Sequence, residues 1–298
     1  MKEGYIKKED RKKILLITDD IRVHSGVAQI GREIVLNTLH KYNWVQMAGA
    51  VQHPEEGKVI DMSDEVKKEQ LVNIDDPYLF LYPVKGYGDI NLLNSVIKRE
   101  KPDAIFLITD PRYFSWLFHN EDQIRKNIPI AYLNIWDNYP APMYNKEFYE
   151  SCDLLMGISK QTVNINKLVL GDKGKNKIFK YIPHGLNSIK FNILEDDDFK
   201  LKEFKKNIQL GEDNNFHLIY NSRNIRRKQV SNIIMAWKLF IDKLSPEEAK
   251  KCQLTLKTEA VFEHGTDLNA VIEYFCDPEI CRVGILQHKL TTEEMNLL

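Results

Sequence analysis

Several features that define common protein classes are scarce or missing in this chain of 298 residues. It has only four cysteines, and the one close pair, Cys276 and Cys281, has no second pair nearby that could complete a zinc site. No apolar run approaches the roughly 18 residues that a membrane-spanning helix needs. The polar N-terminus resembles neither a signal peptide nor a transit peptide. These absences predict a soluble cytoplasmic protein with reduced thiols and no transmembrane segment.

A strong excess of charge of either sign is also absent. The chain has 42 Lys and Arg residues against 43 Asp and Glu residues, which leaves a net charge of −1 at pH 7. Nucleic-acid binders normally carry a large basic excess that neutralises phosphates, so this balance argues against nucleic acid as the partner. Apolar types make up 43% of the residues and charged types 29%, which is the mixture of a globular protein.

The first part of the chain alternates apolar runs with segments of helical period, which is the pattern of βαβ units and parallel sheets. The sequence predicts helices at about 27–40, 91–99 and 161–170. The predicted strands lie at 13–18, 44–51, 78–84, 104–109, 130–136, 154–158 and 178–182. We therefore predict an α/β fold that begins with a doubly wound, Rossmann-like domain over residues 1–190.

The alternation stops after Phe191 and starts again near residue 212. Residues 191–211 are rich in charge, and we predict a solvated linker with room for a short helix. Over residues 212–298 the predicted strands are 216–221, 253–258 and 282–286, and the predicted helices are 230–244, 268–275 and one beginning at 291. A doubly wound domain usually has about five or six strands. The sequence thus predicts a second, smaller parallel-sheet domain that is incomplete.

The glycine patterns of common nucleotide-binding loops are missing as well. Gly26 and Gly31 do not form G-x-G-x-x-G, and no Gly-Lys-Ser/Thr follows, so neither a dinucleotide fingerprint nor a P-loop is present. Gly26 nevertheless opens the first predicted helix, where a glycine lets a phosphate or a sugar approach backbone N–H groups closely. A glycine that only serves the geometry of the turn is the equal alternative.

A run of positive charge follows the predicted strand 216–221, with Arg223, Arg226, Arg227 and Lys228 in one loop. Open α/β sheets bind ligands at the carboxyl ends of their strands. Arginine offers a planar fork to phosphate oxygens, lysine a compact charge, and the N-terminus of the next helix adds positive potential. The loop therefore has the chemistry of a diphosphate site, although spacing alone leaves a solvated basic loop as the alternative.

Four groups of residues follow one another along nearly the whole chain. They are Ser25-Gly26-Val27, the strand and Ser-Lys helix start at 152–160, Ile182-Pro183-His184-Gly185-Leu186-Asn187, and Arg223 with Lys228 five residues on. In this order and spacing they resemble glycosyltransferase family 4. The resemblance implies the GT-B fold, two Rossmann-like domains that face each other across a cleft. It also implies transfer of a sugar from a nucleotide-diphosphate donor with retention of configuration.

The resemblance assigns a role to the basic loop. It is similar to the family's Arg-x4-Lys motif, so Arg223 and Lys228 are expected to bind the donor and stabilise the leaving diphosphate. Arg226 and Arg227 are expected to be the solvated pair. A metal or other cofactor is not expected, because these cations take the role of a divalent ion. The triplet at 196–198 formally fits a metal-binding Asp-x-Asp motif but lies in the polar linker.

Three residues of the first domain are implied as well. Gly26 would admit the donor phosphate or the acceptor. Asp137 stands where many family members present a histidine that touches the donor sugar, and a carboxylate binds sugar hydroxyls well. A turn or helix-cap residue is the equal alternative for Asp137. His184 would line the same wall of the cleft, with a packed histidine as its equal alternative.

One family motif is missing from this sequence. The family carries Glu-x7-Glu beyond the helix that begins near Thr291, and this sequence ends before it. The alternative function is therefore a non-catalytic or truncated GT-B-like binding subunit that needs a second chain. The incomplete sheet predicts exposed apolar surface beside the strand 282–286, which a completing chain or a second copy would cover. The acceptor stays open between a glycan, a lipid and a protein.

Overall fold

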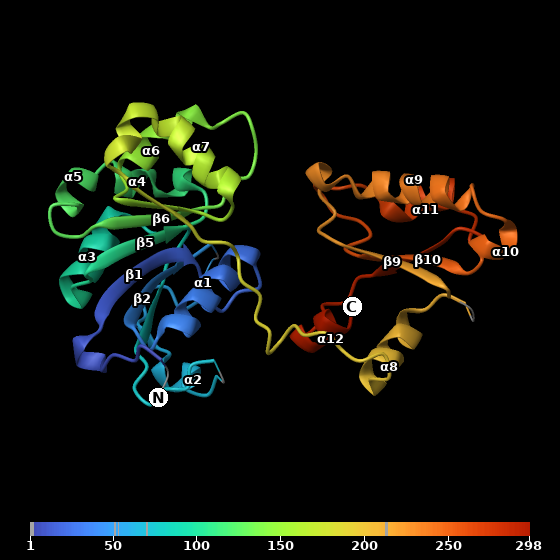
Figure 1. Cartoon of the computed structure of the whole chain (residues 1–298), viewed down its shortest axis with the longest axis horizontal. Coiled ribbons are helices and arrows are strands. Elements are labelled where there is room, and N and C mark those ends of the chain that lie inside the picture. Colours follow the sequence, from blue (N-terminus) through green and yellow to red (C-terminus); the bar gives the residue numbers. More distant parts are fainter. Residues whose placement is uncertain (1–2, 51, 53, 70, 212–213) are drawn as a thin grey trace. The chain divides into compact units, whose positions relative to one another are not determined.

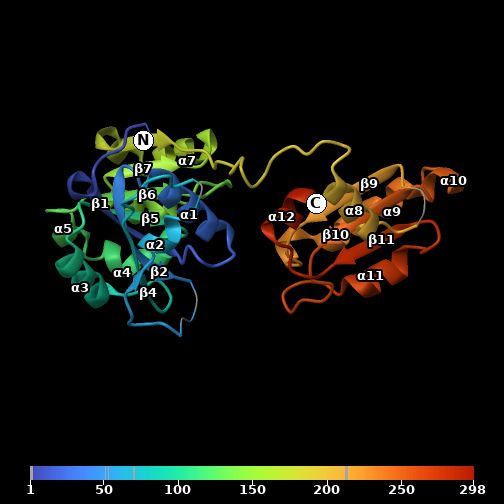
Figure 2. The ribbon, with the colours of Figure 1, turned by 90° about the horizontal axis from the view of Figure 1, so that it is seen from below.

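The computed structural model describes residues 3–50, 52, 54–69, 71–211 and 214–298. The chain divides into an N-terminal unit, Met1–Gly185, and a C-terminal unit, Leu186–Leu298. Each unit has its own sheet (Figures 1 and 2). The boundary that we predicted at 190 lies shortly after Gly185, and the one at 211–212 falls on a residue outside the described part. No helix of the described residues has the length and apolar character to cross a membrane.

The N-terminal unit contains an eight-stranded sheet in the order β3-β4-β2-β1-β5-β6-β7-β8. The strands are β1 (Lys12–Asp19), β2 (Tyr42–Gly49), β3 (Ile60–Asp61), β4 (Leu79–Pro83), β5 (Ala104–Ile108), β6 (Ile130–Asn134), β7 (Leu154–Gly157) and β8 (Ile178–Tyr181). All described pairings are parallel except that of β3 with β4. The neighbours of β1 are β2 on one side and β5 on the other, so the strand order reverses at β1.

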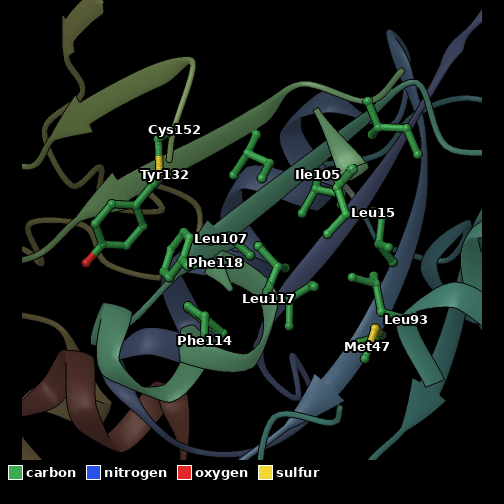
Figure 3. Close-up of a cluster of buried hydrophobic side chains, with 14 of the residues drawn as sticks. Leu15, Met47, Leu93, Ile105, Leu107, Phe114, Leu117, Phe118, Tyr132 and Cys152 are labelled. Atoms are coloured by element: carbon green, nitrogen blue, oxygen red, sulfur yellow. The ribbon is translucent and has the colours of Figure 1, made fainter. Parts of the chain in front are cut away.

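Helices cover both faces of this sheet. On one face pack α1 (Gly26–Thr38) and α2 (Ser63–Val66), and on the other α3 (Ile90–Glu100), α4 (Ser115–Phe118), α5 (Glu121–Ile124), α6 (Lys146–Glu150) and α7 (Lys160–Leu170). Figure 3 shows the second face, where Leu15 and Ile105 of the sheet meet Leu93 and Leu117 of the helices. Because helices cover both sides, the central strands read as continuous apolar runs in the sequence.

The C-terminal unit has a parallel sheet of three strands in the order β11-β10-β9. The strands are β9 (Phe216–Asn221), β10 (Cys252–Lys257) and β11 (Arg282–Leu286); the helices are α8 (Phe199–Ile208), α9 (Val230–Ile241), α10 (Pro246–Ala249), α11 (Leu268–Phe275) and α12 (Thr292–Leu297). The helices α9 and α11 pack over Leu254 and Leu256 of β10 on one face (Figure 1). On the other face the Gln253 side chain donates to the carbonyl of Ile208 (2.7 Å) and accepts from the N–H of Leu210 (2.6 Å).

The predicted linker contains a longer ordered helix than the short one that we expected. The Asp198 side chain caps α8 by accepting a hydrogen bond from the N–H of Leu201 (2.9 Å). Leu201 and Phe204 are buried, and α8 contacts α12. These two apolar residues lie three positions apart and so share one helix face, which the surrounding lysines obscure in the sequence. Asp198 therefore has a structural role in the triplet that formally fits a metal motif.

The second sheet has two edge strands among the described residues, because β10 is central and β9 and β11 flank it. We predicted the edge at β11, and its residues are half-buried. The edge at β9 was not predicted, and it exposes Phe216, Leu218 and Ile219 to solvent. The larger apolar exposure therefore lies on β9.

Asp153, directly before β7, joins three segments of the N-terminal unit. Its carboxylate accepts hydrogen bonds from the Arg125 guanidinium (2.7 Å) and from the N–H of Ile130 (2.9 Å), at the start of β6. Burial alone would raise the pKa of this carboxyl. The hydrogen bonds from Arg125 and Ile130 outweigh it and hold the pKa of Asp153 below its ordinary value.

We expect Asp153→Asn to lower the free energy of unfolding by about 1 kcal/mol at pH 7, a modest figure because the side chain is 37% exposed. The native pKa of Asp153 is depressed. The greater stability of the wild type over Asp153→Asn is therefore present above the unfolded pKa of about 3.9 and is lost as pH falls through the native pKa. Urea denaturation of both proteins near neutral pH and near the native pKa measures this. Asp122→Asn, at an exposed position of α5, is the control. A difference that does not shrink at low pH would contradict the prediction.

Candidate functional site

The carboxyl end of β1 holds a buried carboxylate, Asp19. Its Oδ2 accepts a hydrogen bond from the Ser25 hydroxyl (2.6 Å), and its Oδ1 accepts one from the Tyr87 hydroxyl (2.8 Å). Asp19 thereby ties the start of α1 to the loop after β4. Because the strand order reverses at β1, this edge is the point at which open α/β sheets bind ligands. The sequence showed Asp19 only as part of a long turn, which also holds Ser25, whereas Tyr87 comes from a distant segment.

Gly26, the first residue of α1, has no structural need to be glycine. Ser25 caps the helix by accepting a hydrogen bond from the N–H of Ala28 (3.0 Å). Gly26 is exposed, its φ is not in the left-handed region, and a Cβ at this position would meet no atom of the described structure within 4 Å. Neither the turn nor the packing requires glycine here. This favours the ligand interpretation of Gly26 over the alternative of turn geometry.

An aromatic surface continues from Asp19 toward the loop that follows β5. The Tyr87 ring stacks on that of Tyr113, with their centroids 4.9 Å apart, and the Tyr113 side chain is exposed. Burial and then the hydrogen bond to Asp19 raise the pKa of the Tyr87 hydroxyl, so it stays protonated and donates. The buried carboxylate and the exposed ring are therefore parts of one connected surface.

The same surface extends to the loop that follows β6. The Arg112 Nε donates to the Asp110 Oδ1 (2.9 Å), and this carboxylate raises the pKa of Arg112. Arg112 is followed by Tyr113 in the loop after β5, and the neighbouring parallel strand β6 carries the loop of Tyr144 to the same edge of the sheet. Tyr144 in turn packs edge-on against Trp136, with centroids 6.0 Å apart. Aromatic and polar side chains thus alternate along the carboxyl ends of β5 and β6.

Asp137 lies next to Trp136 in this surface. The strand β6 ends at Asn134, two residues earlier than the predicted strand, so Asp137 lies in the loop beyond it. Its side chain is exposed, and its carbonyl accepts a hydrogen bond from the Gln161 side chain of α7 (3.1 Å). The next helical segment begins at Met143 with Pro142 as its cap, so Asp137 is not a helix cap. A turn residue remains its alternative role.

His184 lies beside α1 rather than beside Asp137. It lines a pocket of about 90 Å³ with Gln29 and Glu33 of α1 and Leu133 of β6. Such a volume holds about three water molecules. Partial desolvation lowers the pKa of the exposed imidazole. The structure therefore brings His184 and Gly26 to the first half of the same helix, and places Asp137 at the carboxyl end of a strand further along the sheet.

In the C-terminal unit, the loop between β9 and α9 exposes all four of its cations, Arg223, Arg226, Arg227 and Lys228. Within the described part of the chain, none of these four side chains forms an ion pair. The N-cap of α9, Gln229, makes no side-chain cap hydrogen bond, so the N-terminus of a twelve-residue helix is left open beside the loop. Positive potential is therefore concentrated here without an internal partner.

The buried side chain of Asn224 anchors this loop. Its Nδ2 donates to the carbonyls of Glu259 (3.1 Å) and Thr266 (2.6 Å), and its Oδ1 accepts from the N–H of Thr266 (3.1 Å). Gly265 packs so closely that a Cβ there would lie 2.2 Å from the carbonyl oxygen of Asn224. Asn224 thus fixes the basic loop to the loop that follows β10. The sequence analysis did not single out Asn224. The available signal was one amide side chain among the charged side chains of the loop.

Two more hydrogen bonds connect the loops at this edge. The Tyr220 hydroxyl donates to the carbonyl of Lys228 (3.1 Å), which fixes the far end of the basic loop. The N–H of Ala260 donates to the Gln287 side chain (3.1 Å), which joins the loop after β11 to the loop after β10. Arg223 and Lys228 therefore project from a framework of three connected loops. Among the described residues, no group of three or more His, Cys, Asp or Glu side chains is placed to hold a metal ion.

No family model and no curated protein matches the sequence. Solved structures do match. The chain is similar to apo OtsA, with a TM-score of 0.63, 13% identity and coverage of 97% of this chain and 76% of that one. It is similar to the UDP-forming α,α-trehalose-phosphate synthase from Burkholderia vietnamiensis, with a TM-score of 0.62, 8% identity and coverage of 96% of this chain and 75% of that one. It is also similar to a glycosyltransferase from Rickettsia africae, with a TM-score of 0.61, 13% identity and coverage of 96% of this chain and 70% of that one. The fold is GT-B. At identities this low, the likeness shows the fold alone.

Each unit of this GT-B chain carries a candidate surface of its own. On the N-terminal unit it is the carboxyl edge around Asp19, with Gly26 and Asp137 on it and His184 beside α1. On the C-terminal unit it is the loop of Arg223 and Lys228, which Asn224 anchors. The first surface offers hydrogen-bonding and aromatic groups, which suit a sugar. The second offers unpaired positive charge, which suits a diphosphate.

Proposed function

We propose that this GT-B chain is a retaining glycosyltransferase that moves a sugar from a nucleotide-diphosphate donor to an acceptor. The observation that carries the proposal is the loop of Arg223 and Lys228. Its cations are exposed and have no ion-pair partner in the described structure, and Asn224 holds the loop beside the open N-terminus of α9. Hydrogen bonds from such cations to phosphate oxygens are about twice as strong as neutral ones. The resemblance to family 4 supports the same assignment.

The chemistry of transfer explains why unpaired cations are useful. When the bond between the sugar C1 and the diphosphate oxygen breaks, negative charge develops on the leaving diphosphate. Arg223 and Lys228 would stabilise this charge together with the N-terminus of α9, without a divalent cation. Asn224 fixes the backbone that carries these cations, so the loop itself needs little reorganisation during the reaction.

The N-terminal unit would supply the groups that position the sugars. Asp137 would accept hydrogen bonds from sugar hydroxyls. Gly26 would let the donor phosphate or the acceptor approach the N–H groups at the start of α1. His184, beside the same helix, would line the same binding surface. These roles come from the family resemblance and from the open surroundings of the three residues.

Titration of the full chain with UDP, GDP and ADP tests the donor site. UDP is the first probe, since one of the similar structures is a UDP-forming synthase. A nucleotide that binds only the native state raises stability by about 2.7 kcal/mol at a 100-fold excess over its dissociation constant, which thermal melts detect. An unchanged melting temperature with all three nucleotides would refute the proposal.

A transfer assay separates the proposed enzyme from the alternative function. The release of nucleotide from UDP-glucose and GDP-mannose is measured with and without added sugar acceptors. Acceptor-dependent release supports the glycosyltransferase. Tight nucleotide binding without release from any donor would instead favour the non-catalytic binding subunit.

Gly26→Ala separates ligand binding from folding at the start of α1. We expect the free energy of unfolding to stay unchanged or to rise by up to about 1 kcal/mol, because alanine is the better helix former and its Cβ meets open space. The affinity for UDP-sugar or for the acceptor is expected to fall about tenfold, which corresponds to 1.4 kcal/mol. Thermal melts and calorimetric titrations measure the two effects. Gly171→Ala, where φ is 54°, is the contrasting control that loses stability instead.

A further inference from the structure

Exposed aromatic side chains of the N-terminal unit gather at the carboxyl ends of β5 and β6. We name Tyr113, Trp136, Tyr139 and Tyr144 the tyrosine platform. The three tyrosines are 57%, 48% and 62% exposed, and Trp136 is half-buried. Trp136 packs against Tyr144, and the Tyr139 hydroxyl accepts a hydrogen bond from Asn164 of α7 (3.3 Å). The rings are therefore held in place although much of their surface faces solvent.

The exposed aromatic surface of the platform is larger than a role in folding alone explains. Exposed large apolar side chains are ordinary when they occur singly, but a contiguous group of them marks a binding surface. Tyr87 differs from the tyrosines of the platform. Its hydroxyl donates a hydrogen bond to Asp19, and its side chain is half-buried. Tyr113 and Tyr144 instead stay largely exposed, although Tyr113 stacks on Tyr87 and Tyr144 packs edge-on against Trp136. The platform thus has the character of a surface that receives a ligand.

The composition of the platform indicates the ligand class. A pyranose ring has one face of C–H groups, which packs on aromatic rings, and a rim of hydroxyls, which needs hydrogen-bonding neighbours. The platform offers ring faces from its tyrosines, and Asp137 and Asn138 lie within the same loop as Trp136 and Tyr139. A lipid chain would instead need an aliphatic surface, whereas the named members of the platform are all aromatic.

The charge around the platform indicates a neutral ligand. Arg112 precedes Tyr113 in the chain, and its Nε donates to the Asp110 Oδ1 (2.9 Å), so this carboxylate offsets its positive charge. The carboxylate of Asp137, beside Trp136, is exposed and would repel a phosphate on the ligand. A phosphorylated or acidic sugar therefore fits poorly here.

We propose that the tyrosine platform binds the acceptor, and that the acceptor is a neutral sugar whose pyranose face packs on Tyr113 and Tyr144. This inference rests on the proposed function and narrows its acceptor from glycan, lipid or protein to an uncharged glycan or glycoside. Tyr113 and Tyr144 then act as specificity-determining residues.

The test uses the full chain saturated with UDP, with sugar binding followed by saturation-transfer NMR and by the change in intrinsic tryptophan fluorescence. The probes are the methyl α-glycosides of glucose, mannose, galactose and N-acetylglucosamine, and glucose 6-phosphate. We expect at least one methyl glycoside to bind more tightly than glucose 6-phosphate. Tyr144→Ala is expected to weaken that binding about 2- to 12-fold and Tyr144→Phe to keep it, because the ring and not the hydroxyl makes the contact.

The control is Tyr274→Ala, at an exposed tyrosine of α11, and it should change neither sugar binding nor UDP binding. Thermal melts confirm that each variant is folded, and Tyr113→Ala is the second variant should Tyr144→Ala fail to fold. Failure of all four methyl glycosides to bind, tighter binding of glucose 6-phosphate, or unchanged sugar affinity in both alanine variants would overturn the inference while UDP binding is intact. Failure of the wild type to bind UDP, GDP and ADP alike would refute the proposed function instead.

Discussion

Replacing Arg223 with alanine is expected to weaken the binding of UDP roughly 10- to 150-fold. One charge-assisted hydrogen bond to a phosphate oxygen contributes about 1.5–3 kcal/mol, which is the free energy of that range in affinity. Arg223 is exposed, makes no ion pair within the described residues, and sits next to the residue that anchors the loop. Its removal therefore disturbs no internal contact that would complicate the measurement. Isothermal titration of the full chain at fixed ionic strength gives the two dissociation constants.

Arg227→Ala is the matched control for Arg223→Ala. Both changes remove one arginine from the same exposed loop, so the diffuse attraction to a polyanion falls equally in the two variants. Only a direct contact distinguishes them, and salt screens the diffuse part over about 10 Å at 0.1 M. We expect the Arg227 variant to bind UDP nearly as well as the wild type. Equal losses in both variants would show that the loop attracts anions without a specific phosphate contact.

The sequence predicts well those elements whose signal is local. β9, α11 and β11 occupy the predicted ranges 216–221, 268–275 and 282–286, because each is an apolar run or helical stripe bounded by polar residues. β3 and the short helices α4, α5 and α6 were not predicted. They span two to five residues, too few for either a period of two or one of 3.6 to become visible.

The same limit applies to the candidate site. The cations of the β9–α9 loop are contiguous in sequence, so their gathering needs no knowledge of the fold. Asn224 was missed because Thr266, its main partner, lies 42 residues away. The placement of Tyr113 and Tyr144 at one edge of the sheet was missed for the same reason, since the neighbouring strands β5 and β6 carry their loops there. The roles of Asp137 and His184 stay predictions.

The largest loss of stability in the C-terminal unit is expected from Asn224→Asp. The two side chains have nearly the same size, and aspartate keeps an oxygen that accepts from the N–H of Thr266. The other oxygen, however, replaces the amide that donates to the carbonyls of Glu259 and Thr266. Asn224 is only 2% exposed, so the substitution buries a charge that faces two carbonyl oxygens. An unpaired buried charge costs about 3–5 kcal/mol, a large part of the stability of a small unit.

The pH dependence of this variant distinguishes the buried charge from a simple loss of packing. Burial beside carbonyl oxygens raises the native pKa of the new carboxyl above its unfolded value of about 3.9. The protonated form regains one donor, so the deficit in stability against the wild type is smallest below the unfolded pKa and grows as pH rises through the native pKa.

Hydrogen exchange over residues 214–298 of the full chain, near pH 4.5 and pH 7, measures this deficit in stability. Asn221→Asp makes the same chemical change at the exposed last residue of β9, directly before this loop, and should cost little at either pH. Because Asn224 also positions Arg223, UDP affinity should fall with stability at neutral pH, and a variant that loses stability equally at both pH values would show that Asn224 does not act as a buried donor.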